Sequence, residues 1–124
     1  MIFYNDNDMV TVSSFGTPHG ASEWHVMART ERGLDVPEEM DRLWSDCESA
    51  LSAHGLSDDT LVFTRFYLSD PPNQCEYLAA SKVYAHALSG AVSAVRQCPA
   101  EGGSVAMYAY HVRGRNGADR KSVV

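Results

Sequence analysis

The residues best suited to chemistry in this sequence are single polar side chains set among apolar ones. Arg65 lies inside the run from Phe63 to Tyr67, and a guanidinium on an apolar strand costs free energy unless a carboxylate pairs with it. That carboxylate can belong to a bound ligand, or to an ion pair between subunits or within the chain with a residue such as Asp70 or Glu76. The sequence therefore leaves both an anion-binding role and a structural ion pair open for Arg65.

Five further side chains are candidate ligand contacts. Arg96 is a similar case to Arg65 but lies at the end of its predicted strand, where arginines are often simply solvated. Asn73 and Gln74, which follow the Pro71-Pro72 corner, either cap a helix or hydrogen-bond a ligand. Ser93 and Tyr108 either fill space on their strands or offer a hydroxyl to a ligand. The predicted substrate-binding set is Arg65, Asn73, Gln74, Ser93, Arg96 and Tyr108. No residue is identifiable as a general base, so the catalytic residues remain unassigned.

The sequence carries no strong local motif for nucleophilic, metal or phosphate chemistry. Its cysteines (Cys47, Cys75, Cys98) form no CxxC pair, and its five histidines form no HxxxH or HxH pair. We therefore expect no metal and no cofactor, and we expect the thiols to be free and buried. No apolar run approaches the ~20 residues that cross a bilayer, and the first residues do not resemble a signal peptide, which predicts a cytoplasmic protein without membrane contact.

Charge is unevenly distributed along the chain. The net charge is −6, with ten Lys+Arg against sixteen Asp+Glu. Residues 113–124 hold four basic and one acidic residue, giving +3, and residues 1–112 hold the remaining −9. An acidic body disfavours nucleic-acid binding. We expect 1–112 to form one domain and 113–124 to be a basic flexible tail, with RNA binding through that tail as the less favoured alternative.

Apolar periodicity predicts two helices and a set of strands. Residues 40–51 show one apolar helical face. We expect this helix to begin after Asp35, as its N-terminal cap, and to end at Gly55. A second helix is expected after Asp70, with Cys75, Leu78, Ala79, Val83 and Ala87 as its apolar stripe, ending at Gly90. Strands are expected at 9–12, 24–29, 61–68, 91–98 and 104–112. This order is that of an α+β fold with two helices on one face of a mixed sheet.

Both faces of the predicted sheet carry large apolar groups. In 61–68 the set with Phe66 and Leu68 opposes the set with Phe63 and Tyr67, and 104–112 has no polar face either. Because helices cover only one face, a second subunit is expected to cover the other. The sequence therefore predicts an oligomer.

The order of elements and several local strings resemble the RidA/YjgF family, also called the endoribonuclease L-PSP family. The resemblance covers about residues 23–112 and is best at 64–70 (TRFYLSD), 90–99 (GAVSAVRQCP) and the closing strand 104–112. It implies a YjgF/chorismate-mutase-like sheet and a homotrimer around a central barrel, with a small anionic metabolite in the clefts between subunits. The Asp70 to Gln74 corner and the Gln97-Cys98-Pro99 ending are also similar to a divergent branch related to the chorismatases.

The resemblance also implies where catalytic residues would lie. Imine deaminases of the family hold the substrate carboxylate with an arginine and position water with a glutamate. Alignment on Pro99 puts the arginine at or beside Gly90 and the glutamate near Tyr108, and neither residue type is present. A hydrolase or deaminase acting on an imine or enol substrate and a non-enzymatic ligand-sensing or scaffold module therefore both remain open.

Overall fold

The computed structural model describes residues 2–7, 9–99 and 102–114 of the chain. Six strands form one mixed sheet in the order β1-β2-β3-β6-β4-β5. The strands are β1 (Ile2–Asn7), β2 (Val10–Gly16), β3 (Ser22–Arg29), β4 (Leu61–Leu68), β5 (Ala91–Arg96) and β6 (Val105–Arg113). Only the pair β4/β5 is parallel; every other pair is antiparallel. The predicted fold class is confirmed, and β1, which the sequence pattern did not indicate, extends the sheet.

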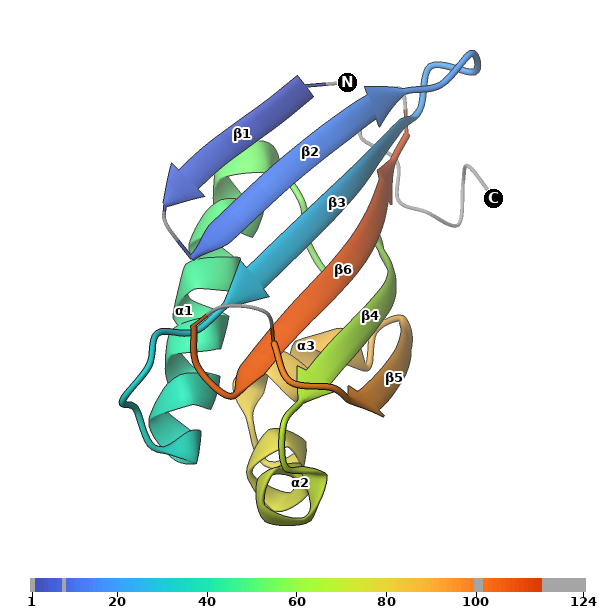
Figure 1. Cartoon of the computed structure of the whole chain (residues 1–124). Helices are drawn as coiled ribbons and strands as arrows, with labels where there is room; N and C mark the ends of the chain where they lie inside the picture. The colour runs from blue at the N-terminus through green and yellow to red at the C-terminus, as the bar shows by residue number, and fades with distance from the viewer. Residues whose placement is uncertain (1, 8, 100–101, 115–124) are drawn as a thin grey trace.

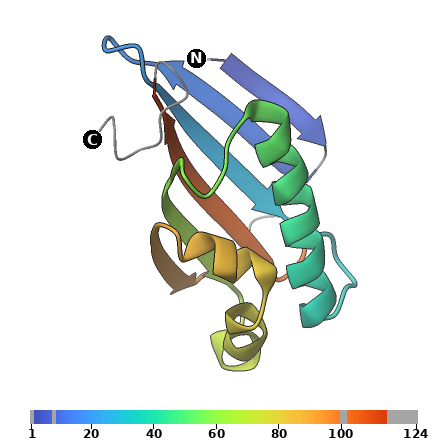
Figure 2. The ribbon, with the colours of Figure 1, turned by 180° about the vertical axis from the view of Figure 1, so that it is seen from behind.

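Three helices lie on the same face of the sheet: α1 (Val36–His54), α2 (Pro71–Ala79) and α3 (Lys82–Ala87). Figure 1 views the sheet from its uncovered side, and Figure 2 shows α1 and α3 in front of the sheet, with α2 beyond the end of β4. Alternate residues of β2, β3, β4 and β6 point to the helices and form the core, among them Val12, Val26, Phe66 and Met107, all at most 1% exposed. We call the uncovered side the open face.

The long helix α1 begins and ends as its sequence predicts. Asp35 accepts a hydrogen bond from the backbone N–H of Glu38 at 3.0 Å, and Gly55 adopts the left-handed conformation with φ 67° after the last turn. One acidic residue of α1 departs from the expected pattern, because Glu39 is only 2% exposed. Its carboxylate accepts hydrogen bonds from the Thr30 hydroxyl and from the backbone N–H of Ser104, each at 2.7 Å. Glu39 therefore ties α1 to the end of β3 and the start of β6, which are neighbouring strands.

The second predicted helix is divided in two. Ser81 accepts a hydrogen bond from the backbone N–H of Tyr84 and caps α3, so the helical phase restarts after α2. In α2 the buried positions are Gln74 and Leu78, so Leu78 is buried as predicted but Cys75 and Ala79 are exposed, and in α3 Val83 is buried as predicted.

Two expectations from the sequence need correction. All three cysteines are free, but only Cys47 is buried, and Cys75 and Cys98 are exposed. Asp70 precedes α2 as predicted, yet its side chain makes no capping bond to the helix backbone.

From residue 115 onward the predicted basic tail lies outside the described residues. Within the described part of the chain, no helix is both long and apolar enough to span a membrane.

Candidate functional site

Strand register brings three of the six predicted site residues into one row on the open face. Arg65 of β4 is the register partner of Ser93 on β5 and of Tyr108 on β6, and Tyr108 in turn is the partner of Met27 on β3. Residues directly opposite one another in a sheet have Cβ atoms about 5 Å apart and point to the same face. The row Ser93–Arg65–Tyr108 therefore forms one local surface on adjacent strands, visible as β5, β4 and β6 in Figure 1.

Arg65 is held by neutral groups. Its Nε donates to the Ser93 hydroxyl at 3.2 Å, and its guanidinium carbon lies 5.3 Å from the centre of the Phe63 ring. Among the described residues, no carboxylate lies within ion-pair distance of Arg65, so neither Asp70 nor Glu76 is its partner. Since Nε is used by Ser93, the two terminal nitrogens remain for an oxyanion, which a guanidinium can bind with two parallel hydrogen bonds.

Tyr108 continues the polar row towards β3. Its hydroxyl lies 2.6 Å from Nδ1 of His25, and the two rings are 5.8 Å apart with planes at 25°. Burial raises the pKa of Tyr108, nearby Tyr67 and Glu23 raise it further, and Arg65 opposes them. The phenol therefore stays protonated beside Arg65 and adds no negative charge to the row.

A hollow adjoins this row. It measures about 400 Å³ and lies at the end of the open face where β4 and β5 finish. Its lining residues are Met27, Arg29, Tyr67, Gln97, Cys98, Pro99 and Ala106. Met27 is the register partner of Tyr108, and Tyr67 lies two residues beyond Arg65 on the same face. The hollow can thus hold the body of a small molecule whose anionic end contacts Arg65.

The other three predicted site residues lie elsewhere. Asn73 donates to the Asp70 carboxylate at 2.6 Å, and buried Gln74 accepts from the Asp70 backbone N–H at 2.8 Å and donates to the Ser104 hydroxyl at 2.9 Å. These bonds fix the corner between β4 and α2. Arg96 is exposed at the end of β5, in register with buried Leu68 and hence on the helix-covered face.

Sequence reasoning missed two neighbours of the row, His25 and Phe63. Alternation along residues 22–29 carries a signal for His25, since Trp24 and Val26 belong to the buried set and His25 and Met27 to the opposite one. Which strand lies beside β3 is a long-range pairing that no local pattern encodes. Without it, His25 cannot be connected to Tyr108.

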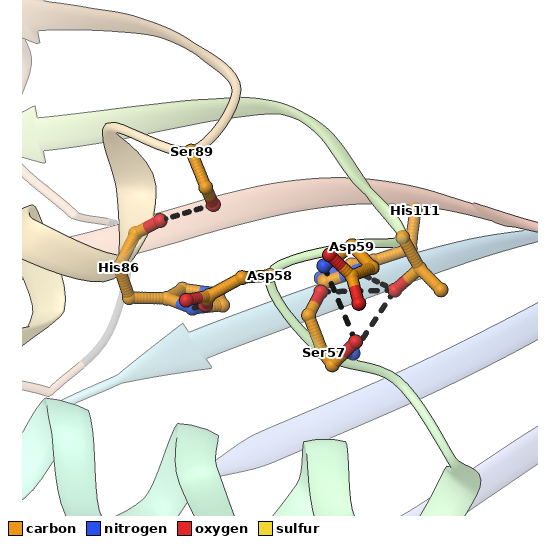
Figure 3. A network of polar contacts seen from close by, with 7 residues as sticks. Ser57, Asp58, Asp59, His86, Ser89 and His111 are labelled. Atoms are coloured by element: carbon orange, nitrogen blue, oxygen red, sulfur yellow. Dashed lines mark hydrogen bonds and ion pairs between the residues drawn. The ribbon is translucent and has the colours of Figure 1, made fainter. Parts of the chain in front are cut away.

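A second polar cluster lies between the sheet and α3 (Figure 3). His86 Nδ1 contacts the Asp58 carboxylate, His111 Nδ1 lies 2.9 Å from the Thr60 hydroxyl, and the two imidazole rings are 6.3 Å apart. Nε2 of both histidines is buried without a hydrogen-bond partner, so neither ring activates a serine hydroxyl. The hydroxyl of neighbouring Ser89 donates instead to the His86 backbone carbonyl. The cluster therefore does not form a catalytic triad.

This cluster borders a hollow of about 670 Å³ between α1, α3 and the segment before β4. Its charged lining includes Glu48, Asp58, Asp59 and Lys82, so it is mainly acidic. An acidic lining disfavours the binding of anions, which are the ligands that the Arg65 guanidinium is suited to bind. Within the described residues, no group of three His, Cys, Asp or Glu side chains is arranged to hold a metal ion.

Comparison with known proteins rests on structure. The sequence matches no protein-family model and no curated protein. The fold is similar to that of Rv2704 from Mycobacterium tuberculosis, a member of the YjgF/YER057c/UK114 family, with 19% identity over 81% of this chain and 98% of that one and a TM-score of 0.54. NMB1025 from Neisseria meningitidis, a YjgF family member, has 17% identity over 82% and 93% of the two chains and a TM-score of 0.54. Yeast Mmf1 has 14% identity over 88% of each chain and a TM-score of 0.56. The chain therefore has the fold of the YjgF/YER057c/UK114 family, as the sequence resemblance implied.

Proposed function

We propose that this protein binds a small anionic metabolite on the open face, in clefts between the subunits of a homotrimer. The observation that carries the proposal is Arg65, whose guanidinium is oriented by Ser93 and Phe63 and has no carboxylate partner among the described residues. A positioned arginine with free terminal nitrogens is a recognition group for carboxylate or phosphate.

The character of the open face supports the oligomer. Met27 is 53% exposed and Phe15 is 38% exposed on this face, and Phe63, Tyr67 and Tyr108 are only partly buried there. An apolar sheet face of this extent is usually covered. A second copy of the chain is the occupant that the family resemblance implies, and its approach would turn the Arg65 row and the adjoining hollow into a cleft.

A binding role without deamination is the form that the structure supports best. Gly90, where the resemblance places the deaminase arginine, approaches β4 so closely that a Cβ atom would lie 2.8 Å from the Val62 carbonyl oxygen. A long side chain at Gly90 would therefore displace backbone. Tyr108 occupies the position near which the resemblance places the glutamate, and a neutral phenol is a weak general base. Hydrolysis of an imine or enol substrate is the second candidate, and it requires a base other than that glutamate.

The first experiment measures assembly and anion binding together. Sedimentation equilibrium is expected to give three times the 13.6 kDa chain mass, and a monomer would refute the cleft. Calorimetric titration with acetate, glycolate, succinate and inorganic phosphate is expected to detect binding, which Arg65→Gln weakens about 10- to 100-fold through the loss of charged hydrogen bonds.

Arg96→Gln is the matched control. Arg96 is an exposed strand arginine like Arg65, but it ends β5 and lies on the other face of the sheet. Its affinity is expected to equal that of the wild type. Loss of binding in Arg96→Gln with retention in Arg65→Gln would assign the anion to the wrong face and overturn the proposal. Turnover of 2-aminoacrylate by the wild type, measured beside binding, would favour the hydrolytic candidate.

A further inference from the structure

Two neighbouring hollows beside α3 form one acidic surface. The hollow of about 670 Å³ is flanked by α1 and α3, the two helices in front of the sheet in Figure 2. A hollow of about 590 Å³ adjoins it and shares Trp44, Glu48 and Lys82 with it. Among the described lining residues of the two, the acidic ones are Asp41, Glu48, Asp58 and Asp59, and the basic one is Lys82. This joint surface, which we call the acidic hollow, therefore favours a cationic occupant.

The acidic hollow offers the groups that bind lysine and arginine side chains. Asp58 contacts Nδ1 of His86, as Figure 3 shows. Glu48 and Asp59 are exposed, and within the described part of the chain neither lies within ion-pair distance of a basic side chain. Trp44 is partly exposed and lines both hollows, and the face of an indole ring attracts cations. Two carboxylates and an aromatic ring are thus available to a cationic segment.

The end of β6 lies beside this surface. The backbone N–H of Val112 donates to the Thr60 carbonyl at 2.9 Å, and the Arg113 guanidinium donates to the His54 carbonyl at 3.2 Å. Positions 54 and 60 bracket residues 56–59, which line the hollow. The residues that follow β6 therefore start next to the acidic hollow.

Those residues are basic and long enough to reach the carboxylates. Residues 115–124 hold three basic side chains (Arg115, Arg120, Lys121) against one acidic side chain, Asp119, which gives +2. Ten extended residues span up to about 33 Å. Glu48 precedes His54 by six residues on α1, which is about 9 Å along the helix axis. Both the charge and the length of this segment therefore fit the hollow.

We propose that residues 115–124 dock in the acidic hollow of their own chain. In the docked state the ammonium of Lys121 lies beside Glu48 or Asp59. Charge complementarity and the position of the end of β6 select this occupant. The docking is independent of the proposed anion site, because the hollow lies on the helix-covered side of the sheet and Arg65 lies on the open face. It also gives the basic segment a partner other than RNA.

Carbodiimide cross-linking of the full chain tests this contact, because the reagent condenses a lysine amine with an adjacent carboxylate into an amide. The lysines of the chain are Lys82 and Lys121, so mass spectrometry of the peptides assigns each lysine link. Lys121 is expected to link to Glu48 or Asp59 in a product of one chain mass, 13.6 kDa. Glu76 is the control acid, because it is exposed on α2 outside the lining of the hollow, and it is expected not to link. At about 1 M salt the yield is expected to fall about fivefold, since exposed ion pairs are weak and are screened there.

A pair of variants separates charge from mere proximity. Arg120→Glu keeps the reacting Lys121 but reverses its neighbour, and it is expected to lower the yield about as much as salt does. Ser122→Gln leaves the charge of the segment unchanged and is expected to keep the yield. An equal yield in both variants would contradict the role of charge complementarity.

Three results would overturn the docking itself. The first is a link from Lys121 to Glu76 as frequent as the links to Glu48 and Asp59. The second is a product of twice the chain mass as the main species, which would place the segment on another copy. The third is the absence of these links together with binding of single-stranded RNA that Arg120→Glu weakens, which would assign the basic segment to nucleic acid.

Discussion

The pH dependence of stability is expected to be set in part by His111, which is fully buried beneath α3. The Thr60 hydroxyl donates to the Ser57 carbonyl at 3.0 Å, so Nδ1 of His111 must carry the hydrogen that joins it to Thr60. An added proton would therefore go to Nε2, which has no acceptor. Burial, with a contribution from the neighbouring His86, lowers the pKa of His111 from 6.5 to about 3.

The sign of the effect follows from proton uptake. Between pH 6.5 and pH 3 the unfolded chain binds a proton at His111 and the folded chain does not, so protonation favours unfolding. The stability that a neutral His111 provides is fully present above pH 6.5 and is lost as the pH falls towards 3. At 1.36 kcal/mol per pKa unit, the loss reaches about 2 kcal/mol at pH 5 and about 4 to 5 kcal/mol at pH 3.

Urea unfolding at pH 7.5 and pH 5.0 measures this contribution in a comparison of the wild type with His111→Asn. Asparagine can still donate an N–H to Thr60, and it removes the titrating ring. Between the two pH values, the wild type is expected to lose about 2 kcal/mol more of its unfolding free energy than the variant. Equal losses in the wild type and His111→Asn would refute the buried neutral imidazole as the source.

Three further predictions concern the frame around the site, each measured by urea unfolding. Gly103→Ala would place a Cβ atom 2.3 Å from Glu39 Oε1 and is expected to cost about 2 kcal/mol or more, whereas Gly16→Ala, with no atom within 4 Å, is expected to change stability by at most about 0.5 kcal/mol; equal effects would contradict the close packing. Glu39→Ala is expected to cost about 2 to 4 kcal/mol because buried donors lose their acceptor, and a neutral result would place those donors in contact with water. Asp35→Ala removes the acceptor of the Glu38 N–H and is expected to cost about 1 kcal/mol, and an unchanged midpoint would mean that another group caps α1.

Local chemistry made part of the fold predictable. Asp35 and Gly55 mark the ends of α1 because capping depends on residues within one helical turn. The division between α2 and α3 was not predictable from apolar spacing, because Ser81 caps a separate helix and because the polar Gln74, and not Cys75, is buried in α2. The burial of Glu39 also escaped prediction, because its hydrogen-bond donors lie outside α1, on Thr30 nine residues before it and on Ser104 65 residues after it.

Three residues of the candidate site could be identified singly from the sequence, but their proximity in the fold could not be predicted. Arg65 attracts attention in the sequence because it interrupts an apolar strand, and Ser93 and Tyr108 do so only weakly. Their meeting depends on β6 inserting between β3 and β4 and on β5 joining β4 in parallel. These pairings join residues 28 and 43 positions apart, and local periodicity holds no information about them.

The proposed anion site differs from the arrangement that the resemblance implies, because its arginine lies on β4 and not at the start of β5. Gly90 approaches the Val62 carbonyl too closely for any side chain, so a cation cannot be supplied there without moving β4 or β5. Arg65 reaches the open face from the adjacent strand instead, and its register partner Ser93 lies three residues after Gly90. A cation on β4 is closer to Tyr108 of β6 than one on the edge strand β5 would be, since β4 lies between the two. In the proposed site, Tyr108 stands where the resemblance would place a carboxylate, and a neutral phenol next to Arg65 leaves the positive charge available to the ligand.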